Sequence, residues 1–417
     1  MRILWFTGTP SLAATKLNSY TTMTGWITSL EKQISGVKEI DLGIAFPYRF
    51  DKPESFKINN TSYYSFPFWK EKGKIMGLWD RWTHVIEPGN EIKYYLQVIE
   101  DFKPDLIHIF GSERSFGNII NHIKIPVVLQ IQGSLSVCTM KYFSGFSAFE
   151  SIIYSHKKSF LLGYSTWHQY YTFKKRAIRE QQFMRNFKFI IGRTEWDKCI
   201  SRIIAPESKY FHCDEILRDQ FYENQWSKFQ NNKFIIFSTL SGSTYKGFET
   251  VLMTANLLKS LNRFDFEWHV AGIEGTHEII SIIERARKLK FSGNNVVFAG
   301  LMNADELAAG LLASDCYVHP SHIENSSNGV CEALLMGVPV IATYAGGTPS
   351  IIQNGVDGLL VQDGDPYFLA GTILELHNYP ERSVLFSRNA RKKAISRHNQ
   401  SAVLENILII YKSIINS

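Results

Sequence analysis

The feature that most constrains the fold of this chain is a regular alternation of short apolar runs with helical patterns. The runs are rich in Val, Ile and Phe, as expected of strands that are buried on both faces. Strand-helix-strand units of this kind build parallel sheets. The predicted strands cover residues 2–7, 105–110, 126–131 and 188–192 in the first half and 233–238, 267–271, 295–299, 315–319 and 338–342 in the second. The sequence therefore predicts an α/β protein with doubly wound parallel sheets.

The chain is too long for one hydrophobic core. Its 417 residues predict two Rossmann-like domains, at 1–220 and 221–399, because single cores stop growing at about 250–300 residues. A polar and aromatic stretch without clear period, 221–232, is the predicted linker. Apolar residues at helical spacing between Gln400 and Ile415 predict a helix with one buried face, and we expect residues 400–417 to cross back to the first domain.

The cysteines and the apolar runs bear on the compartment. Five cysteines are widely spaced and form no Cys-x-x-Cys pair, which argues for a reducing compartment and against a zinc site. The apolar run at 2–7 is too short for a signal peptide, and no uncharged stretch approaches the roughly eighteen residues of a membrane span. We expect a cytoplasmic protein that, if it meets a membrane, is peripheral at its inner face.

The most informative stretch runs from His319 to Gly347. It reads as a strand, a polar loop, a helix from Asn328 and a second strand, so the loop lies where open sheets bind ligands. Eight helical steps would separate Glu324 from Glu332 by roughly 12 Å. Glycosidase carboxylate pairs stand about 5–9.5 Å apart, which disfavours an acid and nucleophile pair. The spacing suits two carboxylates that bind different hydroxyl groups of one long ligand; the plain alternative is two solvated surface glutamates.

This stretch resembles the family-four retaining glycosyltransferases of GT-B fold, well over residues 233–364 and loosely before them. Glu324 and Glu332 fit the family's Glu-x7-Glu signature, and residues 337–347 fit the segment that follows it. The resemblance implies that Glu332 binds the ribose of a nucleotide sugar. It also implies that Glu324, with Asn325, Ser326 and Ser327 after it, holds the donor sugar and phosphate. This version of the motif is similar to that of capsule and lipopolysaccharide transferases.

A second motif follows the predicted strand at 233–238. Lys246 and Gly247 stand where the family has a Lys-Gly pair that binds the donor diphosphate. A cation there stabilises the charge that grows on the leaving diphosphate, so we expect no metal ion or other cofactor. The family's common arginine, about five residues earlier, corresponds here to Thr239 or a nearby serine. The plain alternative for Lys246 is a solvated loop lysine.

Two further positions lie in the first half. Gly25 precedes a predicted helix where the family often has two glycines near the donor phosphate, and a plain turn is an equally good interpretation. Gln132 follows the predicted strand at 126–131, where many family members carry a histidine beside the transferred sugar. Glutamine can donate to one sugar hydroxyl and accept from another, or it can simply satisfy backbone groups.

The predicted basic surface lies at 141–188. This segment holds nine Lys and Arg residues and two Glu residues, a net charge of +7, whereas the whole chain carries +6. Aromatic residues are interleaved with the charges, a mixture suited to an anionic membrane surface or an acidic lipid-linked acceptor. The alternative is a pair of helices with core aromatics and solvated lysines. No motif supports nucleic-acid binding.

Together these features predict a retaining glycosyltransferase of cell-surface polysaccharide biosynthesis. The second domain would bind a nucleotide diphosphate sugar, and the first would bind the glycan or lipid-linked acceptor. Glu324, Lys246 and Gln132 are the predicted catalytic residues. Two alternatives stay open, a nucleotide-sugar epimerase of the same fold and a catalytically silent sugar-nucleotide-binding subunit. The replacement of common residues by Thr239 and Gln132 favours the second alternative.

Overall fold

The computed structural model describes residues 1–17, 25–48, 53–67, 73–87, 91–228 and 232–417. These residues form two compact units, each built on its own sheet. Unit 1 comprises Met1–Thr139, Tyr171–Ile216 and His398–Ser417, and unit 2 comprises Met140–Tyr170 and Leu217–Arg397. The predicted α/β class with two doubly wound sheets is confirmed.

Unit 1 contains a sheet in the order β3-β4-β2-β1-β5-β6-β7-β8, in which all neighbours are parallel except β3 and β4. A hydrophobic cluster covers each face of this sheet. Alternate residues of a strand point to opposite faces, so Trp5 of β1 lies in one cluster and Phe6 lies in the other. The strands are β1 (Arg2–Phe6), β2 (Asp41–Tyr48), β3 (Glu54–Ile58), β4 (Thr61–Pro67), β5 (Leu106–Phe110), β6 (Val127–Gln130), β7 (Phe189–Gly192) and β8 (Lys209–His212).

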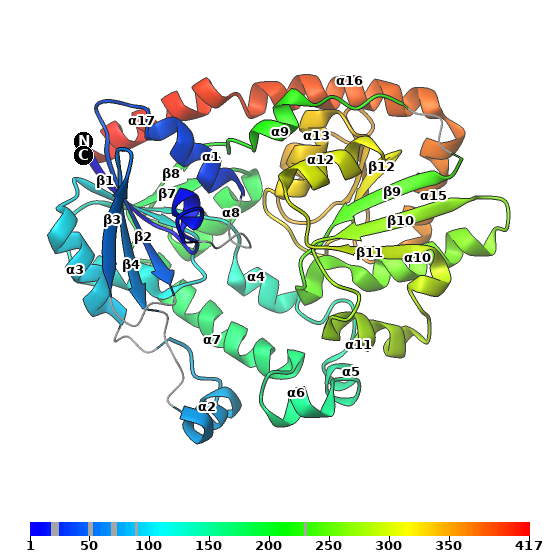
Figure 1. The fold of residues 1–417 in the computed structure, drawn as a ribbon, viewed down its shortest axis with the longest axis horizontal. Helices are drawn as coiled ribbons and strands as arrows, with labels where there is room; N and C mark the ends of the chain where they lie inside the picture. Colours follow the sequence, from blue (N-terminus) through cyan, green and yellow to red (C-terminus); the bar gives the residue numbers. More distant parts are fainter. Residues whose placement is uncertain (18–24, 49–52, 68–72, 88–90, 229–231) are drawn as a thin grey trace. The chain divides into compact units, whose positions relative to one another are not determined.

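Helices pack on both faces of this sheet (Figure 1). The last helix of the chain contributes to the core of unit 1, where the Tyr411 hydroxyl contacts His108 Nδ1 at 2.6 Å and accepts from Trp5 Nε1 at 3.1 Å. The helices of unit 1 are α1 (Gly25–Ile34), α2 (Gly73–Trp82), α3 (Ile92–Phe102), α4 (Leu135–Met140), α8 (Glu195–Ile204) and α17 (Gln400–Ile415), with short 3-10 helices η1 (Ser11–Ala14) and η4 (Ser115–Asn121). The helix α7 (Thr166–Met184) belongs to unit 1 from Tyr171 onward.

Unit 2 contains an all-parallel sheet in the order β11-β10-β9-β12-β13-β14. Its strands are β9 (Phe234–Thr239), β10 (Phe266–Ala271), β11 (Val296–Gly300), β12 (Cys316–His319), β13 (Val340–Thr343) and β14 (Leu359–Val361). The helices are α5 (Ala148–Ile153), α6 (Lys157–Leu161), α9 (Asp219–Glu223), α10 (Phe248–Ser260), α11 (Glu278–Arg287), α12 (Ala304–Leu312), α13 (Asn328–Met336), α14 (Thr348–Ile351), α15 (Pro366–Asn378) and α16 (Pro380–Arg397), with η5 (Thr244–Lys246) and η6 (Ser292–Asn294).

Two segments differ from the sequence-based domain limits. In the first half of the predicted linker at 221–232, Phe221 and Trp226 are 0% and 4% exposed in the core of unit 2, and residues 229–231 of that linker lie outside the described residues. Residues Met140–Tyr170 were predicted within the first domain but pack with unit 2. Arg287 donates to the Gly145 carbonyl at 2.8 Å, a contact between residues far apart in the sequence that no local pattern encodes.

Candidate active site

The carboxyl edge of the unit 2 sheet gathers the residues predicted to bind the donor, except Gly25. Thr239 ends β9, His319 ends β12 and Thr343 ends β13, so the loops that follow these strands meet at one edge. The loop after β9 carries Lys246, and the loop after β12 carries Glu324 and leads into α13. The local cause is the parallel sheet, which places the carboxyl ends of neighbouring strands side by side.

Glu324 accepts two hydrogen bonds on one oxygen. Its Oε2 lies 2.5 Å from Lys246 Nζ and 3.1 Å from His319 Nε2. Burial of the Glu324 carboxyl raises its pKa, but the Lys246 ammonium and the hydrogen bond from His319 outweigh burial and hold the pKa well below its usual range. Glu324 is therefore an ionised acceptor, and its other oxygen has no partner in the described part of the chain.

His319 is a neutral donor to Glu324. Burial lowers its pKa more than the Glu324 carboxylate raises it. An ionised carboxylate can only accept, so the proton of His319 must be on Nε2. Its Nδ1 faces the Tyr317 hydroxyl at 3.5 Å, and that hydroxyl lies 2.7 Å from Thr239 Oγ1. The Thr239 side chain thus belongs to an internal chain of hydrogen bonds behind Glu324, a role that the sequence did not predict.

Two glycines shape the loops around this cluster. Gly247 caps α10 with a φ of +77°, and a Cβ there would overlap the carbonyl oxygen of Pro320. Gly346 has a φ of +56°, and a Cβ there would overlap the carbonyl oxygen of Glu324. Only glycine adopts such conformations at little cost. The backbone amide of Gly347 donates to that Glu324 carbonyl at 2.8 Å, so the loop after β13 fixes the main chain of Glu324.

Glu332 lies in α13 and is held by Arg218. Both the Nε and one terminal nitrogen of Arg218 donate to Glu332 Oε1, at 3.0 and 2.7 Å. Burial raises the pKa of Glu332 above its usual range, against the opposing effect of the guanidinium. Oε2 has no partner among the described residues. Arg218 therefore fixes the carboxylate and leaves one oxygen to accept from a ligand hydroxyl. Sequence reasoning missed Arg218, which is separated from Glu332 by more than a hundred residues.

The three residues after Glu324 form the entry to α13. Asn325 and Ser326 are buried, and Ser326 Oγ lies 3.6 Å from Cys331 Sγ. Ser327 stands at the N-cap and makes no side-chain hydrogen bond to the helix. The first N–H groups of a helix have no partner within it, so this entry presents donors to an anion.

Gln132 and Gly25 belong to unit 1, whereas the other predicted site residues belong to unit 2. Gln132 follows β6, and its carbonyl accepts from Arg193 at 3.5 Å. Gly25 begins α1 with a φ of +69°, which explains the glycine without a ligand. Roles for both residues stay predictions.

His322 has partners that the sequence did not predict. Its Nε2 lies 2.6 Å from Glu249 Oε1, and its Nδ1 lies 3.3 Å from Asp363 Oδ2, which also accepts from Lys141 Nζ at 3.1 Å. Burial lowers the pKa of His322, but the two carboxylates raise it by more, so it lies above its ordinary value. The groups around His322 come from α10, from the loop after β14 and from the 140–170 segment, so no local sequence pattern indicates them.

The matched part of the chain is similar to known glycosyltransferases. Residues 231–378 match the family model "Glycosyl transferases group 1". Sulfoquinovosyl transferase SQD2 of Arabidopsis thaliana is 41% identical over 78 residues, 18% of this chain and 15% of that protein. A GDP-mannose-dependent alpha-mannosyltransferase of Corynebacterium glutamicum is 33% identical over 96 residues, 22% of this chain and 23% of that protein. An uncharacterised 41.2 kDa protein in the cps region of Klebsiella pneumoniae is 27% identical over 174 residues, 40% of this chain and 43% of that protein. The chain thus spans less than half the length of these relatives.

Solved structures share the fold over the whole chain. Sucrose-phosphate synthase from Thermosynechococcus elongatus gives a TM-score of 0.70 at 13% identity and covers 100% of this chain and 99% of its own. Anabaena Alr3699/HepE in complex with UDP-glucose gives 0.66 at 15% identity and covers 99% of this chain and 100% of its own. The resemblance to glycosyltransferases is therefore confirmed for this part of the chain, since residues 231–378 match the group 1 model, and the whole chain shares the GT-B fold of these solved structures.

Proposed function

We propose that this chain is a retaining glycosyltransferase that moves a hexose or hexose derivative from a nucleotide diphosphate sugar to a glycan or lipid-linked acceptor. The observation that carries the proposal is the cluster at the carboxyl edge of the unit 2 sheet. There Glu324, Lys246 and the entry to α13 lie together, and Glu332 is fixed in the helix that follows. Anabaena Alr3699/HepE, which shares the fold, was solved with UDP-glucose, and this supports a nucleotide sugar donor.

Each side chain suits a different part of such a donor. Oε2 of Glu332 would accept from a ribose hydroxyl. The helix entry, with Asn325, Ser326 and Ser327, would donate to the diphosphate. Lys246 has three protons and gives one to Glu324, so two remain for phosphate oxygens. The unpartnered oxygen of Glu324 would accept from a hydroxyl of the sugar.

The reaction requires one bond exchange at the anomeric carbon. The bond from C1 to the diphosphate oxygen breaks, and a bond from C1 to the acceptor oxygen forms on the same face. The acceptor proton passes to the leaving diphosphate, and Lys246 stabilises the negative charge that develops there. This assigns no step to a metal ion. The donor itself supplies the base, so no titrating side chain is required beside the acceptor hydroxyl.

A place in cell-surface polysaccharide biosynthesis is part of the proposal. The relative from the cps region of Klebsiella pneumoniae supports it, as does the form of the Glu-x7-Glu motif. Contact with a membrane surface is also part of the proposal. The surface proposed for this contact is smaller than the whole 141–188 segment, because several residues of that segment are engaged within the protein. Lys141, Arg176 and Arg179 make ion pairs within the protein, and Tyr142 and Phe146 are buried. No described helix is long and apolar enough to span a bilayer.

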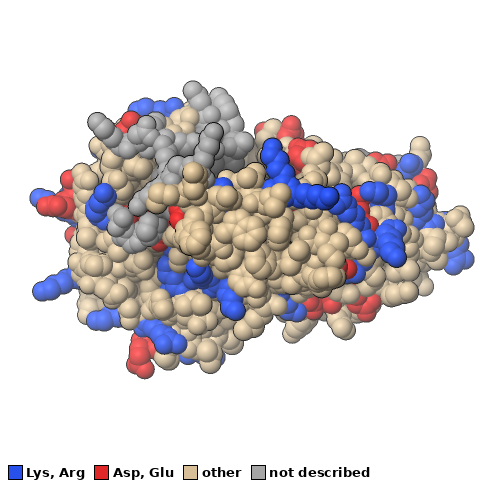
Figure 2. Space-filling model, turned by 90° about the horizontal axis from the view of Figure 1, so that it is seen from below, with Lys and Arg blue, Asp and Glu red and all other residues tan. Residues whose placement is uncertain are grey.

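The surface of unit 2 that we propose for membrane contact consists of α5, α6 and the turn that follows α6. Exposed apolar side chains alternate with the exposed ammonium groups of Lys157 and Lys158. The apolar members are Phe149, Ile152, Ile153, Leu161, Leu162 and Tyr164. Figure 2 shows one face of the molecule, on which Lys and Arg side chains lie among uncharged ones. Apolar side chains beside lysines suit an anionic lipid surface.

The direct test incubates the protein with a panel of uridine and guanosine diphosphate sugars. We expect slow release of the nucleoside diphosphate from one donor, and an α-configured free sugar from an α-configured donor in the first proton NMR spectra. Inversion at C1 would contradict retention. A sugar that changes configuration while still attached to its nucleotide would identify the epimerase. Donor binding without release, in the presence of a broad acceptor extract, would identify the silent subunit.

A further inference from the structure

Glu180 of α7 is a buried carboxylate that the proposed mechanism does not use. Its side chain is 0% exposed, and it accepts hydrogen bonds from two backbone amides and two hydroxyl groups. The amides of Leu135 and Ser136 donate to different carboxylate oxygens, each at 3.2 Å. The hydroxyls of Ser112 and Ser136 donate as well, one to each oxygen. Buried polar groups with this many partners hold their neighbours in a defined arrangement.

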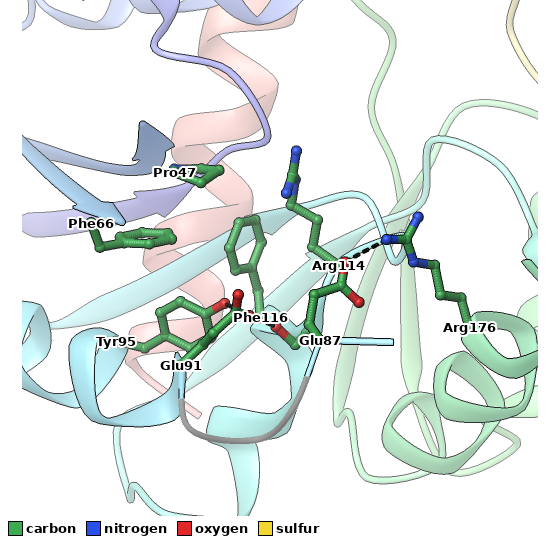
Figure 3. Close-up of a pocket in the computed structure, with 9 residues that line it drawn as sticks. Pro47, Phe66, Glu87, Glu91, Tyr95, Arg114, Phe116 and Arg176 are labelled. Atoms are coloured by element: carbon green, nitrogen blue, oxygen red, sulfur yellow. Dashed lines mark hydrogen bonds and ion pairs between the residues drawn. The ribbon is translucent and has the colours of Figure 1, made fainter. Parts of the chain in front are cut away.

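These contacts connect the turns that follow two neighbouring strands. Ser112 lies in the turn after β5, Leu135 begins α4 directly after the turn that follows β6, and β5 and β6 pair in the sheet. The helix that carries the carboxylate is fixed as well, since Arg176 and Arg179 of α7 bind Glu87 at 2.7 and 2.8 Å. Figure 3 shows the first of these ion pairs. The helix α7 is therefore a fixed support for both turns.

The turn after β6 is held at both of its ends. At its start, the amide of Ile131 donates to the carbonyl of Ile191 in β7 at 2.9 Å. At its end, the first two amides of α4 donate to the buried carboxylate. Gln132, Gly133 and Ser134 lie between these two points. A Cβ at Gly133 would meet no atom within 4 Å, so the turn borders open space. The position of Gln132 therefore depends on the carboxylate that holds the far end of its turn.

Ionisation of Glu180 decides how firmly the turn is held. Burial and the negative charge of Glu113 raise the pKa of Glu180 to about 7, against the opposing effect of its hydrogen bonds. The ionised carboxylate accepts on both oxygens, whereas the neutral acid must donate from one of them. Hydrogen bonds to an ionised acceptor are about twice as strong as neutral ones. The turn is therefore held more firmly above pH 7 and less firmly as the pH falls through this value.

We infer that Glu180 is a positioning residue for the transfer step, which holds Gln132 in place through the amides at the end of the turn after β6. The inference rests on the proposed function, because Gln132 is a predicted catalytic residue of the transferase. Glu180 is fully buried and acts only through the groups that it binds.

The hold on the turn is tested first, on the whole protein and without any donor. Hydrogen exchange of residues 131–140 is measured by mass spectrometry at pH 6 and pH 8 and is corrected for the intrinsic pH dependence of exchange. We expect protection in the wild type to rise between these two values. Glu180→Gln should exchange roughly 10-fold faster at pH 8 and should show no such rise, since glutamine has one acceptor oxygen where glutamate has two.

Glu100→Gln, the same change at an exposed residue of α3, is the matched control and should exchange like the wild type. Equal protection of residues 131–140 in the wild type and in Glu180→Gln would overturn the inference. Near-UV circular dichroism of each variant checks that the core of unit 1 is folded.

Turnover then tests the link to the reaction. A misplacement of 1 Å costs about 100-fold in rate, so Glu180→Gln should lower kcat roughly 10- to 100-fold at pH 8. Donor affinity should change much less, because Lys246 and Glu332 belong to unit 2. The wild-type kcat should fall between pH 8 and pH 6 with an inflection near pH 7 that Glu180→Gln lacks. A variant that is only less stable would keep this inflection, and that result would overturn the positioning role.

A double-mutant cycle tests whether Glu180 acts through Gln132. In the background of Gln132→Ala, the further change Glu180→Gln should have no additional effect on kcat. Additive losses, or a wild-type kcat in Gln132→Ala alone, would overturn the inference. If the wild type transfers no sugar from any donor, the proposed function fails together with the transfer step, and hydrogen exchange still decides whether Glu180 holds the turn.

Discussion

The two glutamates of the Glu-x7-Glu motif are in different electrostatic states. Glu324 is held ionised by Lys246 and His319, whereas burial raises the pKa of Glu332 against the effect of Arg218. One spacing motif thus contains two carboxylates with different neighbours, and each has one oxygen without a partner in the described chain. The motif itself could be recognised in the sequence. Lys246 could be recognised as well, but its ion pair with Glu324 and the ion pair of Arg218 with Glu332 could not, because the partners lie in different segments of the chain.

Glu332 should dominate donor affinity. A hydrogen bond to a charged group is worth about 1.5–3 kcal/mol, so Glu332→Ala should weaken donor binding roughly 10- to 150-fold. Isothermal titration calorimetry with the donor measures this directly. Glu381→Ala, an exposed glutamate in α16, is the control and should bind like the wild type. Unchanged affinity in Glu332→Ala would refute the ribose assignment.

Lys246 should act mainly on turnover. Loss of one preorganised group that stabilises developing charge costs about 100- to 1,000-fold in rate, so Lys246→Ala should lower kcat by that amount and weaken donor binding much less. Lys392→Ala is the control, because it removes one positive charge from the exposed side of α16, away from the site. If kcat and donor affinity fell in proportion, Lys246 would be a general binding group and not a stabiliser of the leaving diphosphate.

His322 should make unit 2 less stable at alkaline pH. Its pKa is raised in the folded state, so its contribution is complete below about pH 6.5 and is lost as the pH rises through the folded value. A pKa that differs by 1 between the folded and unfolded states changes the free energy of unfolding by about 1.4 kcal/mol. For a domain as large as unit 2, this corresponds to a change of about 2–4 °C in Tm. Calorimetry at pH 6 and pH 8 should show this fall in the wild type.

The variant His322→Gln should lose that difference between pH 6 and pH 8, and His122→Gln, an exposed histidine in unit 1, should keep it. A persistent difference in His322→Gln would assign the pH dependence to another group.

At the scale of elements, the alternation of strands and helices was predictable, but the strands β2, β3, β4, β8 and β14 were not predicted. The buried central strands read clearly as apolar runs. By contrast β2 contains Gly43 and Pro47, and β3 and β8 carry exposed residues, so neither pattern marks a buried strand. The segment Met140–Tyr170 was misassigned because its partners, including Asp363 and Arg287, follow it by more than a hundred residues.

The turn into α10 gives a prediction at this scale. Gly247→Ala should destabilise the protein by at least about 1–2 kcal/mol, the cost of a left-handed residue, because the added Cβ also meets the Pro320 carbonyl. Gly371→Ala is the matched control: no atom lies near its Cβ position within α15, and alanine there should stabilise by about 0.4–1 kcal/mol. Urea unfolding measures both. Equal stability of the two variants would contradict the role given to the Gly247 conformation.

At the scale of the whole molecule, the basic excess is only partly available to a partner. Two positive charges near an anionic leaflet contribute about 2 kcal/mol, so Lys157→Glu with Lys158→Glu should weaken binding to anionic vesicles at least about 30-fold. The double variant Arg388→Glu, Lys392→Glu makes the same charge change on α16 and should bind like the wild type. Vesicle pelleting at low and high salt measures this, and recovery of the wild type in the supernatant throughout would reject the membrane surface.

The place of α17 in unit 1 has a consequence for biosynthesis. Val403, Ile407 and Tyr411 complete the core beneath β1 and β5, the first and central strands of unit 1. The ribosome releases these residues after every residue of unit 2. The nascent strands of unit 1 therefore keep one face uncovered until every residue of unit 2 and then α17 have been synthesised. Unit 1, whose first strands are synthesised first, is therefore the unit whose core is completed last.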